Sequence, residues 1–313
     1  MAQTKEIKER ISSIQNTMKI TNAMYMISST KLNNARTALA HTEPYFYALE
    51  AMFARVLRHL PADFHHPFLD RRETLTQEQV RRAIICVTAD KGLAGAYNHN
   101  VIRMAEKRLR PDYNDRLFVV GEVGRDYFDR HGINVDEQFH YTAQKPTLAR
   151  ARQIASRMLE LFASKEIDEV YIIFTRMKNS MENEPQVVQL LPLVRLQNPR
   201  INEQLAAAHQ EEFKMEPSPE VLLDHIVPDF VSGYVYSALV ESYCAEHSSR
   251  MEAMDSANKN GQQLLQELSL MFNRERQAAI TQEITEVAAG AKARNEQKKR
   301  AAARRAARTA QRK

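Results

Sequence analysis

The strongest candidate for a chemical site is a glycine-containing turn after an apolar run. The segment TADKGLAGAYN follows the run at 82–88, and glycine at a strand-to-helix turn lets backbone amides approach a phosphate. Gly92 and Gly95 are spaced G-x-x-G, which differs from the G-x-G-x-x-G of dinucleotide sites, and no Gly-Lys-Ser/Thr ends the turn. The segment GEVG at Gly121–Gly124 departs from the motif similarly. Tight turns that let helices pack on strands explain both segments better than a phosphate site does.

Other reactive side chains do not combine into an active site or a metal centre. His65 and His66 stand beside Pro67 with no cysteine or carboxylate at ligand spacing. Cys244 and His247 share a helix face, but a Cys–His dyad needs a third orienting group, so a buried cysteine in a helix is the better interpretation. No nucleophile elbow or dedicated carboxylate pair occurs. The sequence therefore predicts a chain with no catalytic residues, no cofactor and no bound metal.

The composition of the 313 residues is that of a globular chain with long helices. Hydrophobic residues make up 43% and charged residues 27%, which excludes wholesale disorder, and 8 Gly with 11 Pro disfavour an all-β fold. Two cysteines, Cys86 and Cys244, exclude a disulfide framework. No apolar run approaches the roughly 18 residues that would cross a bilayer, and the charged start lacks the apolar core of a secretory signal. We therefore expect a reducing compartment.

The positive charge is concentrated at the carboxyl end. The net charge is +5, but residues 291–313 hold ten Lys or Arg and one acid, Glu296, so they carry +9 and the remaining residues carry −4. This Ala-rich tail has high helix propensity. A helix would place Arg300, Arg304, Arg308 and Arg312 in one stripe, which could bind an acidic protein, nucleic acid or anionic lipid. A solvated extension is the simpler explanation, and the lack of interleaved aromatics disfavours stacking on single strands.

The N-terminal segment has the heptad pattern of a coiled coil. Apolar or small residues recur in alternating steps of four and three, and neither Gly nor Pro occurs before Pro44. We predict a helix over residues 3–57 of about 80 Å, which Pro44 kinks or ends early. The predicted seam consists of Ile7, Ile11, Ile14, Met18, Thr21, Tyr25, Ser28, Leu32, Ala35, Leu39, Thr42, Phe46, Leu49 and Phe53.

A second long helix is predicted from about Ser218, with no proline after Pro228. An isolated helix would leave its apolar stripe in water, so the two terminal helices are expected to pack antiparallel as one coiled coil. A helical bundle without a mechanical role explains the periodicity equally well. The C-terminal stripe consists of Leu222, Ile226, Val231, Val235, Leu239, Leu264, Leu265, Leu268, Phe272, Ile280, Ile284 and Val287.

The middle of the chain alternates strands and helices, which is typical of a mainly parallel sheet with helices on both faces. The last two strands have no helix between them, so we expect a hairpin and an antiparallel edge. Thr147, after Pro146, is the expected N-cap of the clearest helix. Strands are predicted at 82–88, 116–120, 169–174 and 186–193, with a weak one at 135–139, and helices at 96–109, 124–131 and 147–164.

The predicted fold class is therefore α/β: a long antiparallel coiled coil of N- and C-terminal helices flanking a central doubly wound, mostly parallel α/β domain. The expected segments are an N-terminal helix at 1–60, the central domain at 61–215, a C-terminal helix at 216–290 and the basic tail at 291–313.

Four segments resemble the gamma subunits of F-type ATP synthases. The terminal ones are KEIKERISSIQNTMKITNAMYMISSTKL and RMEAMDSANKNGQQLLQELSLMFNRERQAAITQEITEVAAGA, and QLLPL fits the last strand of that family. The turn DKGLAGAYN is similar to that family's D-R-G-L-C-G-G-L-N, although Ala94, Gly95 and Ala96 stand in place of C-G-G. The resemblance covers roughly residues 3–291.

The resemblance implies a central rotor shaft that couples transmembrane proton flow to ATP synthesis or hydrolysis. Its implied partners are three alpha and three beta subunits, the epsilon subunit and the membrane ring of c subunits, and the catalytic residues belong to those neighbours. The implied location is peripheral, at the cytoplasmic face of a bacterial plasma membrane, and membrane association arises only through the complex. No cofactor and no specific nucleic acid are expected.

The resemblance also implies which residues contact the beta subunits. Met24, in NAMYM, matches the family's coupling methionine, and Arg250, in SSRMEAM, matches an arginine that contacts the same region. The expected polar contact face on the C-terminal helix consists of Arg276, Gln277, Thr281 and Glu283.

Two other classes of function are compatible with parts of the sequence. A coiled-coil adaptor could bind nucleic acid or acidic partners through the basic tail, and a doubly wound domain could belong to a nucleotide-binding enzyme. Both leave the two terminal motifs unexplained. On the rotor interpretation the tail extends about 35 Å beyond the family's usual end, and we expect it to emerge above the head.

Overall fold

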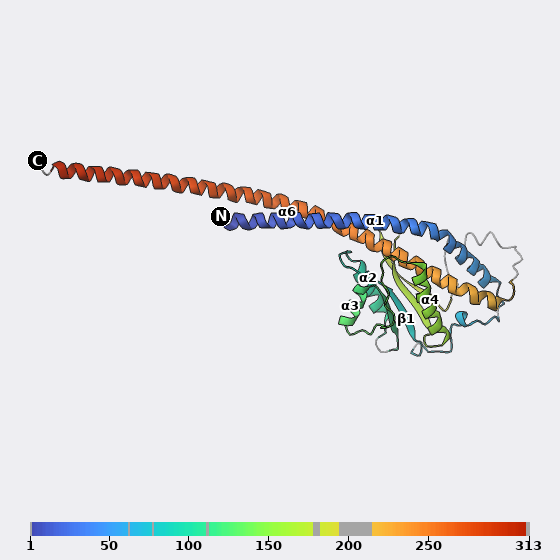
Figure 1. The fold of residues 1–313 in the computed structure, drawn as a ribbon. Coiled ribbons are helices and arrows are strands. Elements are labelled where there is room, and N and C mark those ends of the chain that lie inside the picture. Colours follow the sequence, from blue (N-terminus) through green and yellow to red (C-terminus); the bar gives the residue numbers. More distant parts are fainter. Residues whose placement is uncertain are drawn as a thin grey trace. The chain divides into compact units, whose positions relative to one another are not determined.

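The computed structural model describes residues 2–61, 63–76, 78–110, 113–177, 182–193 and 215–310. The chain divides into two compact units: the coiled-coil unit, Met1–Ala23 with Asp255–Lys313, and the central unit, Met24–Met254. Two long helices, α1 (Ala2–His59) and α6 (Pro219–Ala310), contribute to both units (Figure 1). The sequence prediction divided the chain at the expected helix ends, into segments 1–60, 61–215, 216–290 and 291–313. The two units are instead defined by contacts between residues, so each terminal helix contributes to both units.

In the coiled-coil unit, the start of α1 lies beside α6 (Figure 1). Thr21 donates a hydrogen bond to Asn258, and a Cβ added to Gly261 would lie 2.9 Å from the Cγ of Met18. The contact partner of the earlier residue on α1, Met18, is the later residue on α6, Gly261. The two helices therefore run in opposite directions, which confirms the antiparallel coiled coil. The covered residues keep steps of three and four: Thr4, Ile7, Ile11, Ile14, Met18 and Thr21 on α1, and Asn258, Gly261, Leu265, Leu268, Phe272, Glu275 and Ala279 on α6.

Four apolar residues that the sequence assigned to the C-terminal stripe are not covered by α1. Leu264 is 48% exposed because its neighbour Leu265 occupies the seam, and adjacent helix residues point in different directions. The contacts above set a register in which Thr4 lies opposite Glu275. Helix α1 begins at Ala2, so it does not reach Ile280, Ile284 and Val287, all of which are exposed.

The central unit contains a four-stranded sheet in the order β2-β1-β3-β4. Its strands are β1 (Arg82–Val87), β2 (Arg116–Val120), β3 (Glu169–Met177) and β4 (Asn183–Leu191). Strand β1 pairs in parallel with both β2 and β3, and β4 pairs antiparallel with β3. This confirms the mostly parallel sheet and the antiparallel edge.

Helices cover both faces of this sheet, as the alternation predicts. Ile84 and Cys86 of β1 pack with α2 (Tyr97–Arg108) and α3 (Glu122–Arg130). Ile85 and Val87 point to the other face, where α4 (Leu148–Ala163) and parts of α1 and α6 complete the larger core. The cap is also confirmed, because the Thr147 side chain accepts a hydrogen bond from the Arg150 amide at 3.3 Å. A short 3-10 helix, η1 (Pro67–Leu69), precedes β1.

Two details differ from the sequence prediction. The weak strand at 135–139 is absent: Val135 forms a single bridge with Leu117, after which Asp136 accepts hydrogen bonds from the amides of Gln138 and Phe139 and turns the chain away. Pro44 does not end α1, which continues to His59. Burial of Leu49 and Phe53 explains this, because packing of the last turns outweighs the hydrogen bond lost at proline.

Candidate functional site

The carboxyl edge of the sheet, where doubly wound folds bind ligands, is filled by the chain itself. Gly121 has φ +95°, and an added Cβ would overlap the carbonyl oxygen of Thr88. The Thr88 hydroxyl donates to the Val120 carbonyl and accepts from the Gly124 amide. These contacts confirm that the glycines of the 121–124 turn serve close packing between β1, β2 and α3.

Asp90 lies in the turn after β1, at the start of α3. Its carboxylate accepts hydrogen bonds from the amides of Glu122, Ala143 and Gln144 and from the Thr142 hydroxyl. The amide at the start of α3 is therefore satisfied by a side chain of the same protein. A negatively charged group at this point also repels an anionic ligand, which disfavours the nucleotide-binding interpretation.

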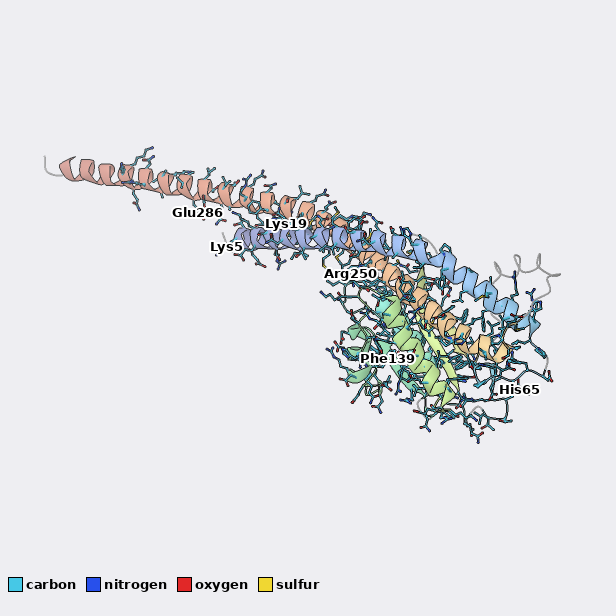
Figure 2. All side chains as sticks on the ribbon, turned by 45° about the vertical axis from the view of Figure 1, so that its right-hand side comes forward. Lys5, Lys19, His65, Phe139, Arg250 and Glu286 are labelled. Carbon is cyan, nitrogen blue, oxygen red and sulfur yellow. The ribbon has the colours of Figure 1, made fainter. Side chains whose placement is uncertain are left out.

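Arg250 of α6 holds the turn after β1 from the other side, and Figure 2 labels it. Its Nη2 donates to the carbonyls of Lys91 at 2.9 Å and Gly92 at 3.1 Å, and its Nε donates to Gly92 at 3.3 Å. Its Nη1 donates to Oε1 of Glu246 at 2.7 Å and to Nδ1 of His247 at 3.2 Å. The side chain is only 7% exposed.

Burial controls the protonation of this cluster. It raises the pKa of Glu246, although the Arg250 charge opposes that shift. Burial also lowers the pKa of His247 to about 3, and the positive charges of Arg250 and Lys31 act in the same direction. Neutral His247 therefore accepts from Arg250 through Nδ1, which leaves its hydrogen on Nε2. This arrangement leaves no Cys–His dyad at Cys244, whose pKa burial raises to about 11.

Met24 lies in the α1 stretch of the central unit and is half-buried. Its neighbours Met26 and Ile27 are 66% and 55% exposed, so apolar side chains face solvent beside it. Sequence analysis did not single out these two residues. The sequence does contain a signal for them, because both are apolar and lie outside the heptad seam. A helix that faces only water at those positions would carry polar residues there.

Arg276, Gln277, Thr281 and Glu283 lie on α6 within the coiled-coil unit, and all four are exposed. The Thr281 hydroxyl donates to the Gln277 carbonyl, so that contact stays within the helix. Side chains project from this part of α6, where Figure 2 labels Glu286. The stretch also exposes the apolar residues Leu270 and Met271, a further signal that sequence analysis missed.

The predicted site residues thus fall into two groups. Met24 and Arg250 belong to the central unit, and the four polar residues of α6 belong to the coiled-coil unit. Of the six, Arg250 is the one whose hydrogen bonds join distant parts of its unit. The other five present side chains to solvent wholly or in part.

The remaining chemical candidates have structural roles. The His66 ring accepts from the Phe68 amide and caps η1. Cys86 and Cys244 are both buried and unpaired as thiols. Within the described ranges, no group of three or more His, Cys, Asp or Glu side chains is arranged to hold a metal ion. Across the same ranges, no helix combines the length and apolar character needed to cross a bilayer.

Comparison with known proteins identifies the family. The family model described as ATP synthase matches residues 3–293. The "ATP synthase gamma chain" of Acetivibrio thermocellus is 39% identical over 296 residues, which cover 94% of this chain and 99% of the relative. This chain belongs to the ATP synthase gamma-chain family. A gamma-chain relative from Ruminiclostridium cellulolyticum is 39% identical over 293 residues, covering 92% of this chain and 98% of that one. A sodium-ion-specific gamma chain from Acetobacterium woodii is 35% identical over 302 residues, covering 93% and 98%.

Solved structures support the same fold for this gamma-chain family member. A chain from the mitochondrial ATP synthase of Euglena gracilis matches with a TM-score of 0.61 and 15% identity, covering 93% of this chain and 94% of that one. A chain from the Tetrahymena thermophila central stalk and c-ring matches with a TM-score of 0.56 and 21% identity, covering 76% and 99%. At these identities the likeness shows the fold alone.

Proposed function

We propose that this chain is the central rotor shaft of an F-type ATP synthase, turning within a ring of three alpha and three beta subunits, here called the head. The observation that carries the proposal is the near full-length relationship to ATP synthase gamma chains. The antiparallel pairing of α1 and α6 supplies a shaft-like element that fits this role. The chain itself contributes no catalytic residue on this proposal.

The shaft acts by making different contacts with chemically identical neighbours. A coil of two unlike helices is asymmetric, so each orientation favours a different conformation at each catalytic site of the head. Ion flow supplies about 2.3 kcal/mol per charge per 100 mV, so several ions must drive each phosphorylation. The same contacts run in reverse when ATP hydrolysis drives rotation.

The remaining partners and the location follow from the same proposal. The sheet-containing central unit meets the epsilon subunit and the membrane ring of c subunits. The complex lies at the cytoplasmic face of a bacterial plasma membrane, and this chain is peripheral there. The bacterial relatives named above support this setting.

We assign the contacts with the beta subunits to the residues that the resemblance implies. Met24, Arg276, Gln277, Thr281 and Glu283 have side chains at least partly open to solvent, which suits contacts that break and re-form during rotation. Long polar side chains exchange partners at small net cost, because surface hydrogen bonds and ion pairs are weak. Arg250 belongs to the same family set, but its donors are engaged within the chain.

Co-expression with the host's alpha and beta subunits tests the proposal directly. Native mass spectrometry of the purified product should show one copy of this chain with three copies of each partner. A chain that stays alone, or forms a dimer without those subunits, would overturn the proposed function.

The assembled complex allows a sharper test at Met24. In Met24→Lys, a charge replaces a flexible apolar side chain, so ATP hydrolysis should continue while ATP-driven ion pumping falls. Met52→Lys is the matched control, because Met52 is also on α1 and is 42% exposed. Equal pumping in the two variants would remove Met24 from the contact set.

The adaptor interpretation is not supported by the comparisons. The family match covers residues 3–293 and leaves only the tail for such a role. An adaptor would bind nucleic acid with a steep salt dependence that vanishes when the tail is removed. We therefore do not propose it.

A further inference from the structure

All three nitrogens of the Arg250 guanidinium already donate hydrogen bonds within the central unit. A guanidinium carries five N–H donors on three nitrogens, and here each nitrogen donates to an acceptor within the central unit. Arg250 is also nearly fully buried where α6 meets the turn after β1. A direct hydrogen bond from Arg250 to another subunit would first require these contacts to break.

The turn that Arg250 holds has an unusual conformation. Leu93 has φ +63°, a left-handed conformation that is strained for a residue with a Cβ atom. Such strain persists where surrounding contacts over-determine the backbone. Arg250 binds the two carbonyls just before Leu93, at Lys91 and Gly92, and Asp90 ties the start of the turn to residues 142–144.

The end of the turn is also anchored to α6. Ala94 is 2% exposed and packs with Ala89, Tyr97 and Ala245 in a small buried cluster. Leu93, between the anchored carbonyls and this cluster, is 65% exposed. The turn therefore presents one large apolar side chain to solvent while its neighbours on both sides are fixed.

We propose that Arg250 is a positioning residue for coupling: it fixes the turn at 90–95 to α6 and so holds the exposed apolar side chain of Leu93 in one place. Any displacement of the adjoining α6 stretch then moves Leu93 with it. The effect on coupling rests on the proposed rotor function, whereas the fixing of the turn by Arg250 does not. Glu246 and His247 support the arrangement by orienting the guanidinium.

A spin label on the turn measures the positioning directly in the full-length chain. Leu93→Cys provides an exposed thiol, while Cys86 and Cys244 are buried and react slowly as thiols of raised pKa. With Arg250 present, the label should give a slow, single-component spectrum. Arg250→Gln should lose the slow component, and Arg250→Lys should lose part of it, because an ammonium cannot donate to both carbonyls in the same planar geometry.

Arg176→Gln is the matched control for the loss of one positive charge beside α6. Arg176 pairs with Glu241 at 3.6 Å and is half-exposed. The Arg176→Gln variant should leave the spectrum of the spin label unchanged. An unchanged spectrum in Arg250→Gln would overturn the positioning role, and the near-ultraviolet circular dichroism of each variant would show whether the core is folded.

The assembled head then tests what the positioned turn does. Arg250→Gln and Leu93→Asp should each keep ATP hydrolysis and lose ion pumping per ATP hydrolysed. Lost pumping in Arg250→Gln with an unchanged spectrum would mean that Arg250 contacts the partner itself, against the inference. Full pumping in Leu93→Asp would overturn the role of Leu93. Failure of the parent chain to assemble with the alpha and beta subunits would overturn the proposed function, whereas the spectra would still test the positioning role of Arg250.

Discussion

At the scale of single residues, glycine geometry decides how closely the elements of the central unit approach. Gly121 and Gly132 both have positive φ, at +95° and +68°. Only Gly121 of these two is crowded, because the Thr88 carbonyl lies where a Cβ would be, whereas nothing lies within 4 Å of the equivalent position at Gly132. A comparison of these two glycines therefore distinguishes the cost of a positive φ from the cost of a steric clash at the added Cβ atom.

We expect Gly121→Ala to destabilise the chain far more than Gly132→Ala. Alanine at Gly132 adds only the strain of a left-handed residue, about 1 kcal/mol. Alanine at Gly121 adds that strain and forces β1 and β2 apart, for a loss of about 3 kcal/mol or more. Urea denaturation of both variants measures the difference. Equal midpoints would mean that the β1–β2 edge relaxes freely.

His247 gives the stability of the chain a specific pH dependence. Its pKa in the folded chain is about 3, below the ordinary value near 6.5, because burial and two nearby cations disfavour the charged ring. Between these values the unfolded chain binds a proton that the folded chain excludes. The free energy of unfolding should therefore fall as pH drops from 6.5 towards 3, by up to about 1.4 kcal/mol per pH unit.

His247→Gln should flatten this pH dependence. The glutamine carbonyl can still accept from Arg250 but does not titrate. Chemical denaturation at several pH values between 4 and 7 measures the slope. His140→Gln, at a largely exposed histidine beside Glu122, should leave it unchanged. A slope in His247→Gln equal to that of the parent chain would refute the assignment.

At the scale of elements, the seam between α1 and α6 explains which helix positions stabilise the coiled coil. Ile7 is 6% exposed and lies in the seam, whereas Ile20, on the same helix, is 62% exposed. Between the apolar layers, Thr21 and Asn258 form a polar layer, and Asn258 also donates to Asn22 at 2.6 Å. Polar groups in a seam fix register at some cost in stability.

We expect Ile7→Ala to loosen the coiled coil and Ile20→Ala to leave it intact. Removing a buried isoleucine side chain costs about 2–4 kcal/mol, and an exposed one costs under about 0.5 kcal/mol. Amide hydrogen exchange around residues 4–14 in the isolated chain measures the effect. Similar exchange in both variants would show that packing in this stretch contributes little.

At the scale of the whole molecule, the chain exceeds its family match at the carboxyl end. The match ends at residue 293, yet α6 remains helical to Ala310. The backbone of the predicted basic stripe is described at Arg300, Arg304 and Arg308, and Arg312 lies outside the described residues. The tail thus continues the helix that carries the proposed contact face.

Deleting residues 295–313 should leave coupling largely unchanged. The deletion spares Arg276, Gln277, Thr281 and Glu283 and every residue of the antiparallel seam. ATP-driven pumping by the assembled complex measures the outcome, with the intact chain as reference. A collapse of pumping would show that the basic tail has a mechanical or binding role of its own.

Elements whose signals are local could be predicted from the amino-acid sequence. Heptad spacing identified the α1–α6 pairing, apolar runs located the four strands, and Thr147 after a proline marked the start of α4. Each signal works because burial on one face, or one capping hydrogen bond, depends on residues close together in the chain. The six candidate contact residues likewise lie within short family motifs, which is why the sequence was enough to propose them.

Features that depend on residues far apart in the chain became clear only in the folded structure. Val135–Phe139 has strand-like composition, but the Asp136 turn removes it from the sheet. Helix α1 passes Pro44 because later residues pack in the core. Arg250 looks like a surface contact in sequence, yet its acceptors at Lys91 and Gly92 are more than 150 residues away. Whether a polar side chain is free or already bound is set by such long-range neighbours, which local pattern does not encode.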